Sequence, residues 1–201
     1  MQEYYVDLHI HIGRTETGVP VKITGARNLT FFNIAKEASQ RKGIDVIGII
    51  DCHSPAVQEE MDRYLDQGEM VELAEGGIQY GRTTILPGTE IEVHDEGFGP
   101  AHLLVYLPTL DKMRSFTRWL SRGMKNVTLS SQRLYVPARD LQAEVLGRGG
   151  LFIPAHIFTP HKSIYGSCTD RMGAVLDLAG ISAVELGLSS DTFMASYLSE
   201  L

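Results

Sequence analysis

The chain has 201 residues, a hydrophobic content of 43% and a charged content of 21%. These values are typical of an ordinary globular protein and predict one domain with a sizeable core. The formal net charge of -7 argues against an evenly basic nucleic-acid binder. No apolar run approaches the roughly 20 residues that cross a bilayer, and the N-terminus lacks the pattern of a secretion signal. We therefore expect a cytoplasmic protein with no membrane partner.

The two cysteines, Cys52 and Cys168, lie far apart and outside any CxxC pair. This spacing argues against a disulfide framework and against cysteine-bound zinc, and it fits a reducing compartment. Charge is segregated along the chain. Residues 59–75 hold seven acidic side chains and one arginine, whereas residues 111–148 hold eight basic and three acidic ones. This asymmetry matters more for a charged partner than the total does.

The first predicted strand covers residues 4–11, where His9 and His11 alternate with isoleucine. Residues two apart on a strand share a face, so we expect Asp7, His9 and His11 on one side. Packing gives little reason for such a face, whereas a divalent metal at the strand end gives a good one. The alternative is a pair of half-buried histidines bonded to backbone.

Strands and helices then alternate along the chain. The further predicted strands are residues 44–51, 84–94, 101–107, 151–155 and 182–186. The predicted helices are residues 29–41 with Thr30 as N-cap, a helix opening at Ser54-Pro55, residues 110–125, 137–148 and 169–178, and a helix from Asp191 onward. A Gly-rich loop is expected at residues 75–83, and the strands that follow it form an antiparallel pair. Repeated strand–helix units predict an α/β barrel or barrel-like sheet.

Several histidines and carboxylates lie at or beside the ends of these strands. The candidate metal ligands are His9, His11, Asp51, His53, Glu90, His102 and His156. We expect them to meet in one ion-holding cavity, because strand ends at the carboxyl side of such a sheet gather at one mouth. Imidazole and carboxylate without thiolate suit Zn, Mn or Fe.

Glu90 is the expected bridging ligand. It follows Pro87-Gly88-Thr89 in an otherwise apolar strand start, where a carboxylate is costly unless it is paired or bound to metal. Glu92 and His94 share its face and are either partners of the ligands or the solvated strand end. His161 is a ligand or a surface side chain, and His53 is a ligand or a polar residue at a helix start.

These motifs resemble those of the polymerase and histidinol phosphatase (PHP) superfamily. The successive matches are Asp7-Leu8-His9-Ile10-His11, Ile50-Asp51-Cys52-His53, Gly88-Thr89-Glu90, His102 and Pro154-Ala155-His156. Residues 89–96, 126–133 and 185–191 resemble the endonuclease Q branch more closely. The resemblance implies a distorted (β/α)7 TIM-like barrel and a phosphoesterase that needs two or three divalent ions, Zn, Mn or Mg. Its endonuclease Q branch nicks DNA beside deaminated bases such as hypoxanthine and uracil.

By the same resemblance, His9 and His11 hold a first metal, Glu90 bridges it to a second, and His102 and His156 complete the second. Asp51 or His53 faces a third. We expect Asp7, Glu90 and His156 to act in catalysis. Two departures stand out: the usual Thr-Asp-His is Asp51-Cys52-His53, and no Asp-x-His motif closes the metal set. We therefore expect residues 1–201 to be an N-terminal part of a PHP domain, incomplete at its C-terminus, with an exposed edge that favours a homodimer.

A basic stripe is predicted on the helix at residues 110–125. Arg114, Arg118, Arg122 and Lys125 fall on one side of it and suit a phosphate backbone, as does Arg133 in the following loop. The alternative is a solubilising face.

The favoured function is therefore a metal-dependent DNA endonuclease of the endonuclease Q type. The alternatives are a PHP phosphatase acting on a small phosphomonoester and a fragment that binds metal or DNA without turnover. An amidohydrolase is disfavoured, because no interior strand carries a lysine that could be carbamylated.

Overall fold

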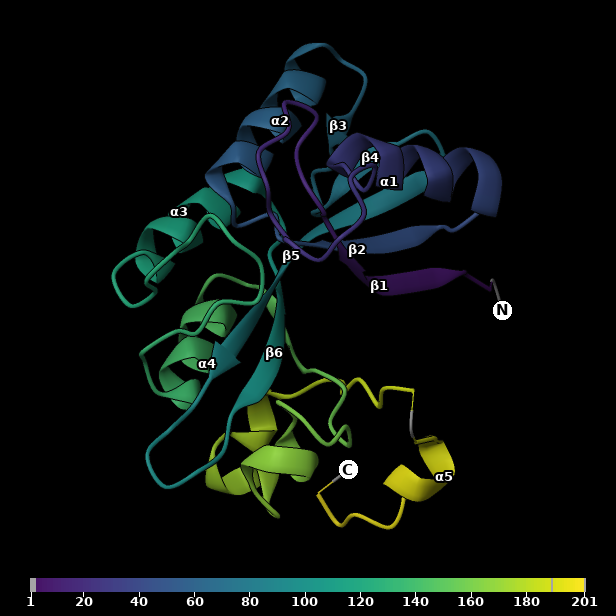
Figure 1. Cartoon of the computed structure of the whole chain (residues 1–201). Helices are drawn as coiled ribbons and strands as arrows, with labels where there is room; N and C mark the ends of the chain where they lie inside the picture. The colour runs from purple at the N-terminus through teal and green to yellow at the C-terminus, as the bar shows by residue number, and fades with distance from the viewer. Residues whose placement is uncertain (1–2, 189, 201) are drawn as a thin grey trace. The chain divides into compact units, whose positions relative to one another are not determined.

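The structure is a computed structural model that describes residues 3–188 and 190–200 (Figure 1). The chain forms two compact units. Unit 1 comprises Met1–Thr89, Tyr106–Arg122 and Asn126–Ser130, and unit 2 comprises Glu90–Val105, Gly123–Lys125 and Ser131–Leu201. Strand β5 (Thr83–Val93) begins in unit 1 and ends in unit 2.

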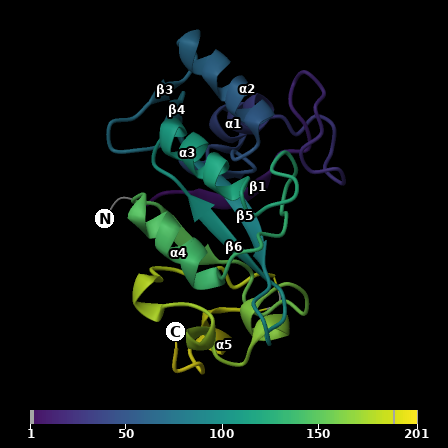
Figure 2. The same cartoon turned by 90° about the vertical axis from the view of Figure 1, so that its left-hand side faces the viewer.

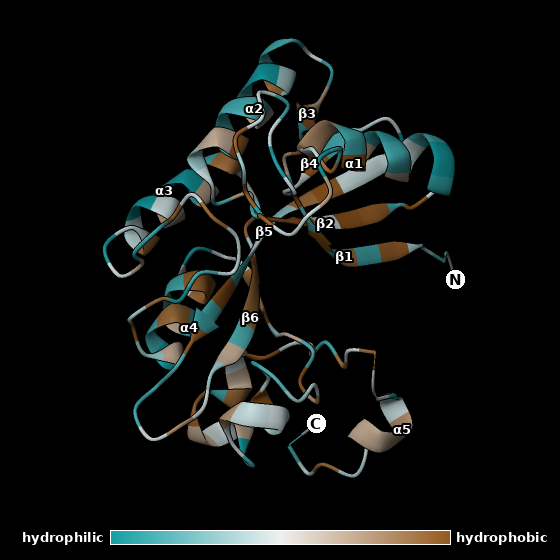
Figure 3. Cartoon of the chain, in the orientation of Figure 1, coloured by the Kyte–Doolittle hydropathy of each residue, from teal (hydrophilic) through white to brown (hydrophobic). Residues whose placement is uncertain are grey.

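Unit 1 is built on a mixed sheet. Its strand order is β1 (Val6–His11), β2 (Val46–Ile50), β5, β4 (Ile78–Tyr80) and β3 (Val71–Glu72). Strands β1, β2 and β5 are parallel, whereas β4 and β3 are antiparallel additions. Strand β4 forms within the predicted Gly-rich loop. Ile47 and Ile49 are fully buried, and each contributes roughly 1.5–3 kcal/mol. Figure 3 shows β2 as mostly hydrophobic, as expected for a parallel strand covered on both faces.

The described residues of unit 1 include the helices α1 (Phe31–Glu37), α2 (Pro55–Asp66) and α3 (Leu110–Leu120). Thr30 caps α1 by accepting a hydrogen bond from the Asn33 N–H, as predicted. A π-helical turn, Ala38–Lys42, continues α1, and Gly43 in the left-handed conformation ends it. Pro55 opens α2, where its missing N–H costs nothing. Helices α2 and α3 lie next to each other (Figure 2).

In unit 2, the second part of β5 pairs with β6 (Ala101–Tyr106), and β6 pairs with β7 (Leu151–Pro154). Helix α4 (Ala138–Gly147) packs on β7, and α5 (Thr192–Ala195) is capped by Asp191. Two short 3-10 turns, Met172–Ala174 and Leu178–Gly180, lie between a π-helical turn (Ile164–Cys168) and α5.

Two predicted elements of unit 2 are wrong. Residues 169–178 form no α-helix: Gly173 is a weak helix former, and the carboxylate of Glu200 accepts hydrogen bonds from the Met172 and Gly173 N–H groups. Residues 182–186 form no regular strand, although Glu185 makes backbone hydrogen bonds with Pro154 and Ile157. Ser189 lies outside the described residues.

The α/β class is confirmed, but a closed barrel is not seen. Within the described ranges, β1 and β3 end the strand order of unit 1, and β7 pairs only with β6. The sheet is therefore open. In the same ranges, no helix is long and apolar enough to cross a bilayer.

A β-bulge in β1 sets the direction of its histidines. The register slips between Asp7 and Ile10, and the Leu8 carbonyl accepts a hydrogen bond of 2.6 Å from the Tyr106 hydroxyl. Two glycines make room for this contact. A Cβ at Gly48 would lie 2.4 Å from the Leu8 oxygen and 2.6 Å from the Tyr106 ring, and one at Gly88 would lie 2.9 Å from the same ring.

We predict that Gly48→Ala destabilises the protein by about 1–3 kcal/mol, because backbone and ring must move to admit one methyl group. Gly147→Ala, at the end of α4, is the matched control: a Cβ there would meet nothing within 4 Å, so the change should be neutral or slightly stabilising. Urea unfolding of both variants measures the difference. Equal stability of Gly48→Ala and the wild type would show that the bulge does not depend on this contact.

Candidate metal centre

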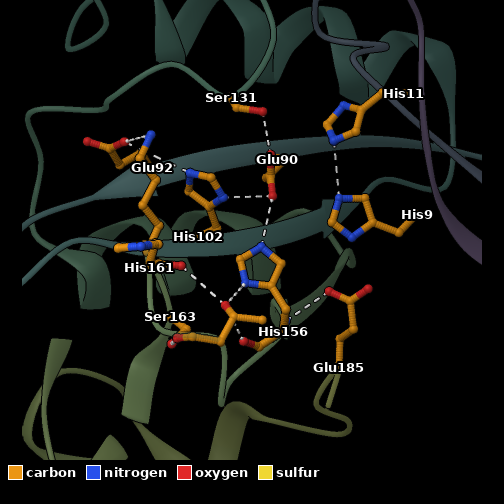
Figure 4. A network of polar contacts seen from close by, with 12 residues as sticks. His9, His11, Glu90, Glu92, His102, Ser131, His156, His161, Ser163 and Glu185 are labelled. Carbon is orange, nitrogen blue, oxygen red and sulfur yellow. Dashed lines mark hydrogen bonds and ion pairs between the residues drawn. The ribbon is translucent and has the colours of Figure 1, made fainter. Parts of the chain in front are cut away.

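Glu90 is the central residue of a polar cluster in unit 2 (Figure 4). It lies on β5 with 3% of its surface exposed. One carboxylate oxygen, Oε1, lies 2.8 Å from His102 Nδ1 and 3.4 Å from His156 Nε2. The other, Oε2, accepts a hydrogen bond from the Ser131 hydroxyl. Burial would raise the pKa of the Glu90 carboxyl, but the hydrogen bonds from His102, His156 and Ser131 lower it well below its usual range. Glu90 is thus an ionised carboxylate at neutral pH.

His102 lies between two carboxylates. Its Nδ1 faces Glu90, and its Nε2 lies 3.9 Å from Glu92 Oε2, beyond hydrogen-bond range. This Nε2 is a buried polar atom without a hydrogen-bond partner in the described part of the chain. Glu92 is held by Lys162, whose Nζ lies 2.7 Å from its Oε2. Lys162 also accepts a hydrogen bond from the His102 N–H through its backbone carbonyl. Glu92 and Lys162 therefore flank the ligand group.

His156 follows β7 and is positioned by residues on either side of it. Its Nδ1 lies 3.0 Å from Thr159 Oγ1, which leaves Nε2 directed at Glu90. Its backbone N–H donates to the Glu185 carboxylate at 2.9 Å (Figure 4). Glu185 and Lys162 were not among the predicted site residues. Two sequence signals pointed to Glu185: its position in the predicted strand at 182–186, and its position in the stretch 185–191 that resembles the endonuclease Q branch.

A second group lies in unit 1, at the carboxyl ends of β1 and β2. The Nε2 atoms of His9 and His11 are 3.2 Å apart. His11 Nδ1 lies 3.0 Å from Asp51 Oδ2 and 3.1 Å from Ser130 Oγ. Because the carboxylate can only accept, it holds the proton on Nδ1 and directs the lone pair of Nε2 toward His9.

Asp51 acts on this group from a fully buried position. Its Oδ2 also accepts from the Ile12 N–H at 3.1 Å, whereas its Oδ1 is buried without a hydrogen-bond partner in the described residues. Its φ of 89° is rare for any residue other than glycine. The geometry favours Asp51 as the group that orients His11.

The described non-glycine residues with positive φ are Asp51, Ser131, His156 and Lys162. Each of them contacts a histidine or a carboxylate of the two groups described above. Such strained backbone is costly and concentrates at functional sites. This coincidence supports a functional role for both groups.

Asp7 is placed apart from the histidines, contrary to the prediction of a shared face. The bulge interrupts the alternation, so Asp7 and Ile10 line one groove of about 630 Å³ against α1. Asp7 is exposed, and its Oδ1 accepts a hydrogen bond from the His9 N–H. Its side chain can fix the bulge but does not join the two imidazoles.

His53 is also not positioned as a ligand. Its Nε2 donates to the Leu129 carbonyl at 3.2 Å, and its Nδ1 lies 2.7 Å from the Thr89 hydroxyl. Both ring nitrogens are therefore used within the protein. Burial lowers the pKa of His53 and so favours its neutral form. His53 ties the segment before Ser130 to β5, which is a structural role.

The predicted basic stripe is only partly present. Helix α3 ends at Leu120, so Arg122 and Lys125 lie beyond it. Arg114 forms ion pairs with Asp62 on α2 and Asp111, so its charge is already balanced. Arg118 and Arg122 are exposed in unit 1. Lys125 and Arg133 belong to unit 2, where both lie close to the Tyr135 ring.

Both groups have the donor chemistry of a divalent-metal site. Two ligands of a tetrahedral zinc ion, each about 2.0–2.1 Å from it, are about 3.3–3.4 Å apart, close to the His9–His11 separation of 3.2 Å. In unit 2, ligand atoms of Glu90, His102 and His156 lie within 4.8 Å of one another. The buried, unpartnered His102 Nε2 and Asp51 Oδ1 are further evidence of fit, since such atoms are costly unless a partner binds.

The chain is similar to several known proteins. No protein-family model matches it. It is 55% identical to the uncharacterized protein YqxK of Bacillus subtilis, over all of this chain and 52% of that protein. Endonuclease Q from Pyrococcus furiosus, a lesion-specific endonuclease, superposes with a TM-score of 0.77 at 25% identity over 96% of this chain. Endonuclease Q bound to a 27-mer duplex with an abasic lesion superposes with a TM-score of 0.78 at 25% identity.

A more distant structure has the same fold. It is a protein from Bifidobacterium adolescentis classed provisionally as a metal-dependent phosphoesterase, with a TM-score of 0.52 and 14% identity. The structural similarity therefore supports a PHP-type, endonuclease Q-like fold for this chain, and the resemblance seen in the sequence is confirmed. The chain spans 52% of YqxK and 44% and 45% of the two endonuclease Q chains.

We predict that His53→Asn lowers stability by about 1–3 kcal/mol, because a buried hydrogen bond to Thr89 or Leu129 is lost. The same variant should bind as much Zn²⁺ or Mn²⁺ as the wild type, whereas His156→Asn should bind less. Thermal unfolding and metal analysis after dialysis test the pair. Loss of metal from folded His53→Asn would contradict the purely structural role and would show that His53 is a metal ligand.

Proposed function

We propose that this chain carries the catalytic metal site of a DNA endonuclease that hydrolyses a phosphodiester bond beside deaminated bases. The observation that carries the proposal is the buried, ionised Glu90 with two imidazole nitrogens on one of its oxygens. Such a carboxylate is a typical bridging ligand between divalent ions. The likeness to endonuclease Q, a lesion-specific endonuclease, supports the reaction class.

We further propose that the ligand set implied by the sequence resemblance holds two or three ions, Zn, Mn or Mg. By that resemblance, His9 and His11 would hold one ion, His102 and His156 would hold another, and Glu90 would be shared. The His9–His11 pair of unit 1 and the Glu90 group of unit 2 each have the donor atoms of a divalent-metal ligand, which supports this proposal.

The chain's own residues then have distinct roles. Glu90 supplies negative charge from a buried position, and Asp51 and Thr159 orient the imidazole rings of His11 and His156. Lys162, 47% exposed beside Glu92, adds a positive charge at the rim. Divalent ions at this site would supply the Lewis-acid chemistry for the attack of water on a phosphodiester. No serine or cysteine nucleophile is required.

DNA is the proposed substrate because endonuclease Q has been solved with a DNA duplex and because exposed cations remain outside the metal groups. Arg118, Arg122, Lys125 and Arg133 are the candidates for phosphate contacts, while Arg114 is occupied by Asp62. Selectivity for a deaminated base would come from extruding that nucleotide from the duplex. The assignment of residues 1–201 as an N-terminal part of a PHP domain and the homodimer stay predictions.

We predict that Glu90→Gln loses bound metal and cuts a deoxyinosine duplex roughly 100-fold or more slowly, because a bridging charge worth several kcal/mol is removed. Glu59→Gln, an exposed glutamate on α2, is the matched control and should behave as the wild type. Metal analysis and gel assays of nicking provide the measurements.

The same assays separate the alternative functions. Hydrolysis of a nucleotide monophosphate in preference to the duplex would favour a phosphatase. Metal and DNA binding without turnover, both in this chain and in a chain extended past Leu201, would favour a binding module. Full activity of Glu90→Gln would contradict the proposed site.

A further inference from the structure

Tyr135 is a surface tyrosine of unit 2 with two cations against its ring. Its side chain is 54% exposed. The Lys125 Nζ lies 5.3 Å from the ring centroid, and the Arg133 Cζ lies 5.0 Å from it. An exposed cation–π contact contributes little to stability, which is a weak reason to gather three such side chains.

The backbone holds these side chains on one face. Met124 and Leu134 form an antiparallel bridge, and the Tyr135 N–H donates to the Gly123 carbonyl at 2.7 Å. Antiparallel register therefore places Lys125 opposite Arg133. The bridge residues Met124 and Leu134 are buried, so the residues next to them share the opposite face, on which Lys125 and Tyr135 are exposed and Arg133 is half-buried.

These three side chains form the Tyr135 cluster (Lys125, Arg133 and Tyr135). The cluster is also anchored close to the metal ligands of unit 2. Glu92 on β5 donates its N–H to the Gln132 carbonyl and accepts from the Leu134 N–H. Glu92 is two residues from Glu90. The cluster is thus fixed by backbone hydrogen bonds to the strand that carries the expected bridging ligand, so it is not a mobile surface feature.

The charge of the cluster is not balanced by the protein. Like charges directly opposite each other on paired strands are unfavourable. Neither Lys125 nor Arg133 forms an ion pair with any described carboxylate, in contrast to Arg114 and Arg148. Arg133 Nη2 makes one long hydrogen bond, 3.3 Å, to the His94 carbonyl, and its Nε is buried without a partner among the described residues. An anion bound between Lys125 and Arg133 would offset the repulsion of these like charges and would give the Arg133 guanidinium a further partner.

We propose that Lys125, Arg133 and Tyr135 form a nucleotide subsite for the DNA strand that flanks the cleaved bond. The two cations bind a phosphate, and the exposed Tyr135 ring packs against the adjoining base, as aromatic side chains do in single-strand binding. This subsite rests on the proposed function, because DNA is its ligand. It adds a positioning role: the strand is held a fixed distance along β5 from Glu90.

The test is DNA binding in EDTA, where cleavage cannot occur. Fluorescence anisotropy of the full chain with a labelled oligonucleotide should show a Kd raised roughly 5- to 150-fold in Tyr135→Ala, the range expected for the loss of one stacked base. Tyr135→Phe keeps the ring and should bind as the wild type does. Tyr4→Ala removes another exposed tyrosine, 60% exposed, and is the matched control.

The phosphate contact has a separate readout. Lys125→Gln should reduce the slope of log affinity against log salt concentration by roughly 0.7–0.9, because one phosphate contact is lost. Lys42→Gln, an exposed lysine of unit 1, should leave the slope unchanged. An unchanged slope in folded Lys125→Gln would show that Lys125 does not contact a DNA phosphate.

Binding and cleavage distinguish the two proposals. If the wild type nicks a deoxyinosine duplex and Tyr135→Ala binds it equally well, the subsite is wrong and the proposed function stands. If Tyr135→Ala weakens binding but no chain with bound metal cuts DNA, the subsite stands and the proposed function fails. Equal loss of binding in Tyr135→Ala and Tyr4→Ala would also overturn the subsite.

Discussion

The burial of the Glu90 carboxylate is the constraint on which the site depends. A charged group with 3% of its surface exposed would be costly without partners, and unit 2 supplies three: His102, His156 and Ser131. These partners come from β6, from the end of β7 and from the segment after residue 130. The ligand group of unit 2 therefore forms only where these three segments are brought together around β5.

Specific local contacts, more than bulk packing, set the orientation of the ligand side chains. In unit 1, the bulge of β1 is fixed by the Tyr106 hydroxyl, and Gly48 and Gly88 leave room for the ring. Asp51 in turn fixes the tautomer of His11. In unit 2, His156 is held through Thr159 and Glu185. Positive φ values at Asp51 and His156 show that the backbone is strained where these groups are aimed.

The sequence predicted the elements with strong local signals. Alternation in β1, the apolar run of β2, the cap at Thr30 and the first-turn proline Pro55 were sufficient to locate those elements. The structure also brings together Glu90, His102 and His156, as expected, although the predicted cap residue Ser54 makes no side-chain capping hydrogen bond. The failures of the sequence prediction depended on tertiary contacts. The bulge that turns Asp7 away needs the distant Tyr106, and the role of His53 is set by Thr89 and Leu129. The Glu200 carboxylate binds N–H groups within the predicted helix at 169–178, and Arg114 loses its predicted role to Asp62 on another helix. Local periodicity carries no signal for partners so far away in the chain.

The most direct measurement is anomalous diffraction at the zinc or manganese edge from crystals of the full chain grown with that metal. We predict a peak about 2.0–2.2 Å from a carboxylate oxygen of Glu90 and within the same range of a His102 or His156 ring nitrogen. A fully occupied metal peak that touches neither Glu90 nor these histidines would contradict it.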